Sequence, residues 1–274
     1  MTFLHQGRME AVAVWALLLS CGVSTATEQV TAIPATEPVI TLDMAPNAVD
    51  DMYSGCKDKM KTKVEKEFLP NEKNTNSQFR QAWEEAEQVY NTKWKRETVM
   101  AKEQFIAIYA YNFGKRQIYQ DIKTAIQTQH CNYKTTFSYH SMTFFLTDAL
   151  QNLNARGKEK GRCFIAYHRV DQYFSQNVLG KEIRFGYFTS TTLRGYNTKQ
   201  RKGNKSCFKI ETCYGADISM FGNVDTEALI PPYEVFNVTG IKRRCQQPSL
   251  ECDVVYELKS THALSNLNCA LFPQ

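Results

Sequence analysis

The sequence has no Cys-x2-Cys pair, and its 5 histidines are scattered. A structural zinc site needs closely spaced thiolate and imidazole ligands, so we expect no metal site. Long basic runs are also missing, and the formal net charge of +5 is spread over 274 residues. We therefore expect no nucleic-acid partner. No Gly-rich phosphate loop, nucleophile elbow or zinc-protease helix occurs, so any catalytic residues must be dispersed along the chain.

Runs of about 20 apolar residues, the length of a membrane helix, are missing as well. The first stretch carries Arg8, an apolar run from Ala11 to Leu19 and small residues up to Ala26. This layout predicts a signal peptide, residues 1–26, with an uncleaved anchor as the alternative. We expect a secreted, extracellular protein without stable membrane insertion.

The cysteines suit an oxidising compartment. Cys21 lies in the predicted signal peptide, which leaves an even set able to form four disulfides. Two triplets, beginning at Asn204 and Asn237, are acceptors for N-glycosylation on the secretory route and predict a glycoprotein. The remaining cysteines are Cys56, Cys131, Cys163, Cys207, Cys213, Cys245, Cys252 and Cys269.

The folded part has a helical half and a strand-rich half. Residues 27–41 are rich in Thr, Pro and Ala and indicate a flexible lead-in, followed by a single domain over residues 42–274. Apolar residues recur at helical spacing from about Met52 to Leu153. After Gly157 the runs become short or alternating, and this order predicts an α+β fold. The expected strands are Cys163–Tyr167, Glu182–Ser190, Ser206–Cys213, Tyr233–Val238 and Cys252–Leu258.

Several separated motifs occur in an order that is specific to one family. The run Ile183–Leu193 contains Phe-Thr-Ser-Thr-Thr, and the run Glu227–Glu234 contains Glu-Ala-Leu-Ile-Pro-Pro. Upstream lies Leu42–Asn47, followed by an acidic pair at positions 50 and 51, and Gly215–Ser219 lies between the two main motifs. From Leu42 to Cys269 the chain resembles the vertebrate arginine-specific ADP-ribosyltransferases of the ecto type.

This resemblance implies a fold and an activity. The fold would be a helical lobe packed on a mixed β-sandwich core. The activity would be transfer of ADP-ribose from NAD or NADP to a protein side chain, most often arginine, with release of nicotinamide. NAD is then a substrate, and no separate cofactor is expected. The expected partners are NAD and an extracellular protein with an exposed arginine, and we expect a monomer.

The resemblance also assigns roles to single residues. Glu227 is the catalytic carboxylate, and Ser190 orients the NAD ribose. Asp225 stands where arginine-directed members have Glu, so it is expected to receive the acceptor guanidinium at about 1.5 Å shorter reach. Tyr109 lies in a segment that would stack on nicotinamide or adenine, with core packing as the alternative. Phe221 lies in the loop before Asp225, and it is either a contact to the target protein or a buried residue.

One expected residue is replaced. The family places an arginine after a strand tyrosine to bind the NAD phosphates, and here His168 follows Tyr167. A histidine, with a reference pKa of about 6.5, is mostly neutral at extracellular pH and lacks the planar fork of arginine. Arg169 is adjacent but would face away in a regular strand, unless a bulge re-aims it toward the phosphates. We keep both residues as candidates for NAD binding.

The resemblance implies two disulfides, Cys56–Cys269 and Cys163–Cys213. The pairing of the other four cysteines stays open, and the version to test first is Cys131–Cys207 with Cys245–Cys252.

Two other functions stay open. One is NAD hydrolysis, in which water replaces the protein acceptor. The other is a degenerate member that has lost catalysis at His168 and acts as a secreted binding or structural protein.

Overall fold

The computed structural model describes residues 37–96, 99–156, 163–196, 203–222 and 227–272, all in one compact unit. The expected signal peptide, residues 1–26, lies outside the described residues, as does most of the lead-in, so both stay predictions. Within the described part, no helix is long and apolar enough to cross a membrane.

The first half of the unit is helical, as expected. Helix α3 shows how the sequence builds it: Phe79, Trp83 and Ala86 line its buried face, and the Asn76 side chain accepts a hydrogen bond from the Phe79 N–H at 3.0 Å. That bond satisfies one of the free donors of a first helical turn. The helices are α1 Lys57–Lys63, α2 Leu69–Thr75, α3 Ser77–Val89, α4 Lys102–Phe113, α5 Arg116–Thr128 and α6 His140–Arg156, with π-helical turns at Val64–Phe68 and Tyr90–Trp94.

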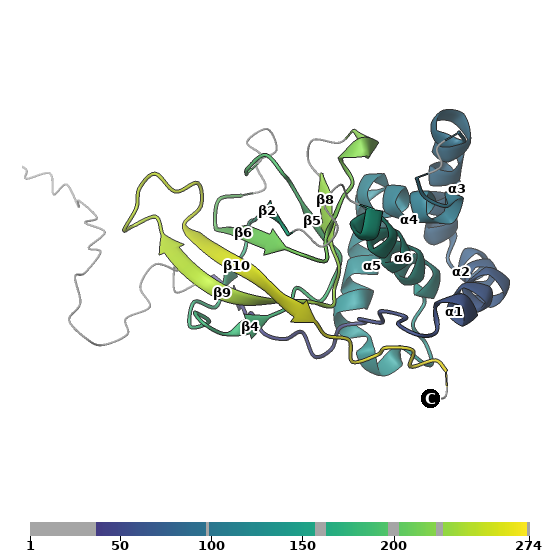
Figure 1. Ribbon diagram of the computed structural model, residues 1–274, viewed down its shortest axis with the longest axis horizontal. Helices are drawn as coiled ribbons and strands as arrows, with labels where there is room; N and C mark the ends of the chain where they lie inside the picture. The colour runs from purple at the N-terminus through teal and green to yellow at the C-terminus, as the bar shows by residue number, and fades with distance from the viewer. Residues whose placement is uncertain (1–36, 97–98, 157–162, 197–202, 223–226, 273–274) are drawn as a thin grey trace, which may run out of the picture. The chain divides into compact units, whose positions relative to one another are not determined.

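The second half forms mixed sheets, which confirms the α+β prediction (Figure 1). A five-stranded sheet has the order β2-β6-β10-β9-β4, and a three-stranded sheet has the order β5-β8-β7. Strand β6 runs parallel to β10, whereas the other pairs within these two sheets are antiparallel. The strands are β1 Val39–Ile40, β2 Phe164–Val170, β3 Tyr173–Phe174, β4 Glu182–Ile183, β5 Thr189–Thr191, β6 Ser206–Thr212, β7 Ala216–Asp217, β8 Ala228–Ile230, β9 Glu234–Arg243 and β10 Val254–Ala263.

The three-stranded sheet packs against the helices. Phe188 and Leu229 are fully buried in the same apolar cluster as the helical side chains Phe105 and Tyr111. Figure 1 shows β5 and β8 beside α4, α5 and α6. A second cluster, which includes Phe208 and Tyr256, is formed by buried side chains of the five-stranded sheet and the segments packed on it.

The run Glu182–Ser190 is not one strand, contrary to expectation. Gly186 has φ +70°, and a Cβ atom there would lie 2.6 Å from the Cβ of Ala45. Glycine is the residue that adopts this conformation and this close approach without strain. The chain therefore leaves the five-stranded sheet after β4 and enters the three-stranded sheet at β5.

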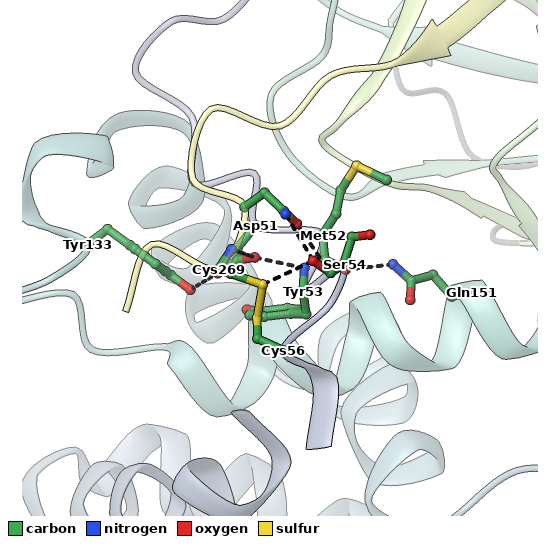
Figure 2. The surroundings of a disulfide bond; sticks show 9 residues. Asp51, Met52, Tyr53, Ser54, Cys56, Tyr133, Gln151 and Cys269 are labelled. Atoms are coloured by element: carbon green, nitrogen blue, oxygen red, sulfur yellow. Dashed lines mark hydrogen bonds between the residues drawn. A yellow bond between two sulfur atoms is a disulfide. The ribbon is translucent and has the colours of Figure 1, made fainter. Parts of the chain in front are cut away.

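Both disulfides implied by the resemblance are present, Cys56–Cys269 and Cys163–Cys213. The first closes a loop of 213 residues and contributes about 5 kcal/mol to the free energy of unfolding in the chain-entropy account. Hydrogen bonds surround it (Figure 2): the Asp51 carboxylate accepts from the Cys269 N–H at 2.9 Å and from the Tyr133 hydroxyl at 2.7 Å. The two ends of the domain are thus held together.

The expected pairing of the other four cysteines is wrong. Cys207 is bonded to Cys252, while Cys131 and Cys245 are free and exposed. The cause is the parallel pairing of β6 and β10, which sets Cys207 opposite Val255 and thereby close to Cys252.

A fully buried ion pair joins three distant segments. The Arg184 Nη1 atom lies 2.6 Å from Asp50 Oδ2, and both side chains have no exposed surface. Arg184 also donates to the carbonyl oxygens of Met44 and Leu264, each at 2.7 Å, and Asp50 accepts from the Leu267 N–H at 3.0 Å. The bonds of Arg184 link both the start and the end of the domain to the chain just after β4, and the bond between Asp50 and Leu267 links the start to the end.

We expect Arg184→Met to lower the free energy of unfolding by about 3 to 5 kcal/mol, because it leaves the Asp50 charge buried without a partner. Chemical denaturation under non-reducing conditions measures this. The control is Lys242→Met, which removes an ion pair to Glu257 of similar length, 2.7 Å, from a partly exposed site and should cost less than about 1 kcal/mol. Equal losses in the two variants would contradict the role of the buried pair.

Glu72 in α2 is a buried carboxyl at the start of α6. Its oxygens accept from the Ser141 N–H at 3.2 and 3.4 Å, and burial raises its pKa to about 8. The neighbouring His140 stacks on Phe68 at 4.2 Å, and burial lowers its pKa to about 4. Both side chains are therefore neutral in the folded protein at pH 7.

Between pH 4.5 and about 8 the unfolded chain loses the Glu72 proton while the folded chain keeps it, so the contribution of Glu72 to the free energy of unfolding falls as pH rises. His140 opposes this below pH 6.5, because there only the unfolded chain keeps the imidazole proton. We expect Glu72→Gln to remove the dependence that Glu72 causes. The free energy of unfolding of the variant should then rise relative to that of the native protein by at most about 1.4 kcal/mol per pH unit in that window. Denaturation at several pH values measures the gain. Glu65→Gln, at an exposed carboxylate, should follow the native curve. A gain from Glu72→Gln that does not change with pH would contradict this assignment.

Candidate active site

Glu227 lies directly before β8, the middle strand of the three-stranded sheet. Its N–H donates to the Thr191 carbonyl at 2.9 Å, and its own carbonyl accepts from the Ile218 N–H at 2.8 Å. The backbone is thus paired on both sides, and only 5% of the residue is exposed. Burial and double pairing hold this carboxylate at a defined place at the end of the strand.

The two carboxylate oxygens of Glu227 have different partners. Oε2 accepts from the Leu193 N–H at 2.7 Å. Oε1 lies 3.4 Å from Nε of Arg194, whose side chain is 87% exposed. A backbone donor therefore fixes one oxygen, while the partner of the other is a mobile type of side chain that a ligand can displace.

Glu227 lies beside the serine strand. The antiparallel register pairs Ser190 with Leu229 and Thr191 with Ala228, and the Glu227 N–H then bonds to the Thr191 carbonyl. The Leu193 N–H, just after the serine strand, reaches the Glu227 carboxylate. The sheet thus brings the serine motif and the glutamate motif together.

Helix α4 positions Ser190. The Ser190 hydroxyl donates to Oδ1 of Asn112 at 3.0 Å, and Nδ2 of Asn112 donates to the Ile108 carbonyl at 2.9 Å. The second bond fixes the orientation of the amide, so that its oxygen faces the serine. The adjacent Tyr111 donates its hydroxyl to the Phe188 carbonyl at 2.8 Å. Two consecutive helical residues therefore hold the serine strand.

His168 lies beside Ser190. Its Nδ1 is 2.9 Å from the Ser190 carbonyl, and because that oxygen can only accept, Nδ1 carries the proton. The ring lies 6.1 Å from the rings of both Phe185 and Phe208. One ring nitrogen is therefore engaged by the backbone of the serine strand.

Arg169 points to the other face of β2. The pairing of β2 with β6 runs from Phe164 to Val170 without a register shift, so the bulge considered for this strand is absent from it. Arg169 donates Nη2 to the Glu251 carbonyl at 3.0 Å and to its carboxylate at 3.2 Å. The structure does not bring Arg169 to Ser190 and Glu227, because strand alternation turns it away.

Phe221, in the short helical turn Ser219–Phe221 upstream of Glu227, packs among aromatic side chains. The Phe221 ring lies 4.8 Å from Phe105 and 5.7 Å from Trp94, so it packs on the helical lobe and is half-buried. Tyr109 belongs to the same aromatic group, with its ring 5.1 Å from Phe113. For both Phe221 and Tyr109 the alternatives were a contact to a ligand or target protein and packing in the core. These contacts are packing contacts. Asp225 lies outside the described residues.

Sequence reasoning missed Asn112 and Arg194. Asn112 interrupts the apolar and aromatic run Phe105–Phe113 of α4, and an amide side chain there was a usable signal. Arg194 follows the serine motif by two residues, but only the fold of the turn after β5 brings it to Glu227.

A second buried glutamate provides a comparison. Glu234 has no exposed surface and accepts from the Thr212 hydroxyl at 2.6 Å and from the Cys213 N–H at 2.7 Å. Burial raises the pKa of its carboxyl. Its bonds tie β9 to the end of β6, so Glu234 has a structural role, whereas Glu227 meets an exposed side chain.

Known proteins resemble this chain over the region that holds these residues. The sequence profile of the family described as NAD:arginine ADP-ribosyltransferase matches residues 42–256. The chain is 31% identical over 239 residues to NAD(P)(+)--arginine ADP-ribosyltransferase 1 of Gallus gallus, which covers 85% of this chain and 73% of that protein. It is 30% identical to Ecto-ADP-ribosyltransferase 5 of Homo sapiens, over 85% of this chain and 81% of that protein.

Solved structures of ADP-ribosyltransferases resemble this fold. A crystal structure of the eukaryotic mono-ADP-ribosyltransferase ART2.2 superposes with a TM-score of 0.65 at 29% identity, over 84% of this chain and 98% of that one. Mutants of ART2.2 have been solved in complex with NAD and with NADH.

Proposed function

Because the chain belongs to the NAD:arginine ADP-ribosyltransferase family, we propose that it transfers ADP-ribose from NAD to arginine side chains of a protein and releases nicotinamide. The membership confirms the resemblance that the serine and glutamate motifs carry. The observation that supports the chemistry most directly is the buried Glu227 carboxylate, which is held by the N–H of Leu193 just after the strand that carries Ser190.

The reaction breaks the N-glycosidic bond between ribose and nicotinamide. Positive charge develops on the ribose, and the nicotinamide nitrogen takes the bonding electrons. A carboxylate that binds the ribose 2-hydroxyl more tightly as this charge forms lowers the barrier. Glu227 has this role in our proposal. Its Oε2 is already oriented by a backbone donor, which leaves Oε1 to meet the ribose once Arg194 is displaced.

Ser190 positions the ribose. Its hydroxyl hydrogen is directed to Asn112, so the lone pairs of its oxygen face away from the amide and can accept from a sugar hydroxyl. This arrangement favours orientation of the substrate over stabilisation of charge.

The binding of the NAD phosphates is the weak point of the site. His168 lies next to Ser190 but supplies no permanent charge, while Arg169 is engaged with Glu251 on the opposite face. We infer that His168, rather than Arg169, stands at the phosphate position. Tyr109 remains a candidate for stacking on NAD only at the half-buried edge of its aromatic group.

The acceptor is proposed to be an arginine on an extracellular protein. Three disulfides are typical of secreted proteins, and the relatives include ecto-enzymes. Asp225 is the proposed ligand of the acceptor guanidinium. NAD hydrolysis is the second candidate, favoured by the exposure of the side chain that covers Oε1, since water can take the same place. NAD itself is the substrate in both reactions, and we propose that the protein acts as a monomer.

We expect Glu227→Gln to lower the rate of ADP-ribose transfer at least about 10²-fold, because the amide keeps the bond to Leu193 but loses the charge. Transfer of labelled ADP-ribose to polyarginine measures the effect, and release of nicotinamide measures hydrolysis separately. Glu257→Gln, at a carboxylate in the five-stranded sheet, is the control and should retain activity. Nicotinamide release without labelled polyarginine would select the hydrolase, and full activity of Glu227→Gln would reject its role.

We expect His168→Arg to tighten NAD binding by several-fold or more, because arginine adds a permanent charge and a fork of donors for phosphate. Calorimetry with NAD measures the dissociation constant. Arg169→Gln is the comparison and should leave it unchanged, since that side chain faces Glu251. The reverse pattern would assign phosphate binding to Arg169, and no binding by any of these proteins would favour the degenerate, non-catalytic member.

A further inference from the structure

Lys123 on α5 is a half-buried cation beside the serine strand. Its Nζ lies 4.0 Å from the centre of the Tyr187 ring, and Tyr187 precedes Ser190 by three residues. No hydrogen bond or ion pair joins this ammonium group to any part of the chain that the structure describes. Burial lowers the pKa of Lys123, and the nearby Tyr119 hydroxyl opposes this only in part. The fold thus holds a positive charge here with little compensation.

Other lysines of the helical lobe have a carboxylate partner. Nζ of Lys63 lies 2.5 Å from Glu67, and Nζ of Lys102 lies 2.5 Å from Glu87. A cation taken out of water costs free energy unless opposite charge or hydrogen bonds compensate for the lost solvent, and a ring face compensates only partly. The ammonium group of Lys123 is therefore a place where an anion gains free energy by binding.

Helix α5 connects Lys123 to the serine strand through Tyr119. The two residues are one helical turn apart, so their side chains lie on the same face of α5. The Tyr119 ring lies 5.0 Å from that of Tyr111, which holds the serine strand. Burial raises the pKa of Tyr119, whereas the charge of Lys123 and a hydrogen bond to Ser190 lower it. Tyr119 therefore lies between the cation and the serine.

His168 borders the same stretch of chain from the five-stranded sheet. Its ring lies 6.1 Å from Phe185, and the Phe185 ring lies 6.2 Å from Tyr187, the ring that Lys123 covers. Residues 185–190 thus have a histidine on one side and a lysine on the other. The neighbouring Arg184 is paired with a buried carboxylate, whereas Lys123 has no carboxylate partner among the described residues.

Resting on the function proposed above, we propose that Lys123 binds the pyrophosphate of NAD and supplies the permanent positive charge that His168 lacks. The pyrophosphate is joined through C5 to the same ribose that Ser190 orients, so a cation linked to Ser190 through Tyr119 stands on its path. A lysine binds phosphate as a point charge with three donors and needs no planar alignment. The long stem of Lys123 allows its Nζ to leave the Tyr187 ring for the phosphate.

The test is calorimetry of the full chain with NAD. Lys123→Met keeps an apolar stem on Tyr187 but removes the charge, so the dissociation constant should rise about 10-fold or more. Lys123→Arg keeps the charge and should bind NAD nearly as the native chain does. Lys115→Met, at the start of the same helix, is the matched control: its ammonium group is 62% exposed, lies 3.5 Å from Glu85, and should not affect NAD.

Two further measurements separate charge from packing. Salt screens charges, so higher ionic strength should weaken NAD binding by the native chain more than by Lys123→Met. Adding His168→Arg to Lys123→Met should restore most of the lost affinity, because it returns a cation to the other side of Ser190. A loss that is equal at every salt concentration and is not restored in the double variant assigns Lys123 a packing role and contradicts the proposal.

Enzyme kinetics distinguish this proposal from the proposed function. With polyarginine as acceptor, Lys123→Met should raise KM for NAD and leave kcat nearly unchanged, because the phosphate contact is made before and during the reaction alike. Transfer by the native chain together with unchanged NAD affinity of Lys123→Met overturns the role of Lys123 alone. A native chain that neither binds NAD nor transfers ADP-ribose nor releases nicotinamide overturns the proposed function as well.

Discussion

The buried ion pair between Arg184 and Asp50 is the constraint on which the rest of the structure depends. Two charges without exposed surface are tolerated because carbonyl and N–H groups satisfy the hydrogen-bonding capacity that the pair leaves over. Those groups come from the first and last segments of the domain. Arg184 also stands two residues before Gly186, where the chain turns from one sheet into the other. The pair therefore sets the point from which the serine strand starts.

From that point the site follows by short-range contacts. Tyr111 and Asn112 hold the serine strand from the helical side, and β8 pairs with that strand on the other side. Strand β8 places Glu227, the residue directly before it, at the end of the three-stranded sheet, and the ring of Phe221 packs on the helices. The strands that bear the motifs have only three residues each, so their position depends on these neighbours rather than on their own pairing.

The two glutamates of the second motif show how burial separates structure from chemistry. Glu234 is enclosed, and each of its oxygens has a donor from the protein interior. Glu227 is nearly as buried, but one of its oxygens meets a solvent-exposed arginine. An interior partner is costly to replace, while an exposed one is readily exchanged for a ligand. This difference, rather than the residue type, makes Glu227 the reactive one in our proposal.

The sequence by itself determined the α+β order, the face of α3 and, through its resemblance to a family, two disulfides, and it named Glu227 and Ser190 as the candidate site residues. Such features depend on local periodicity or on motifs that occur in the family's order along the chain. Tertiary structure decided the pairing of Cys207 with Cys252, the break at Gly186, the contact of Arg169 with Glu251 and the meeting of Arg194 with Glu227. Each of these depends on the register between strands or on a close approach between distant segments. Local patterns carry no record of which strand lies beside which, because that choice is made by packing of the whole core.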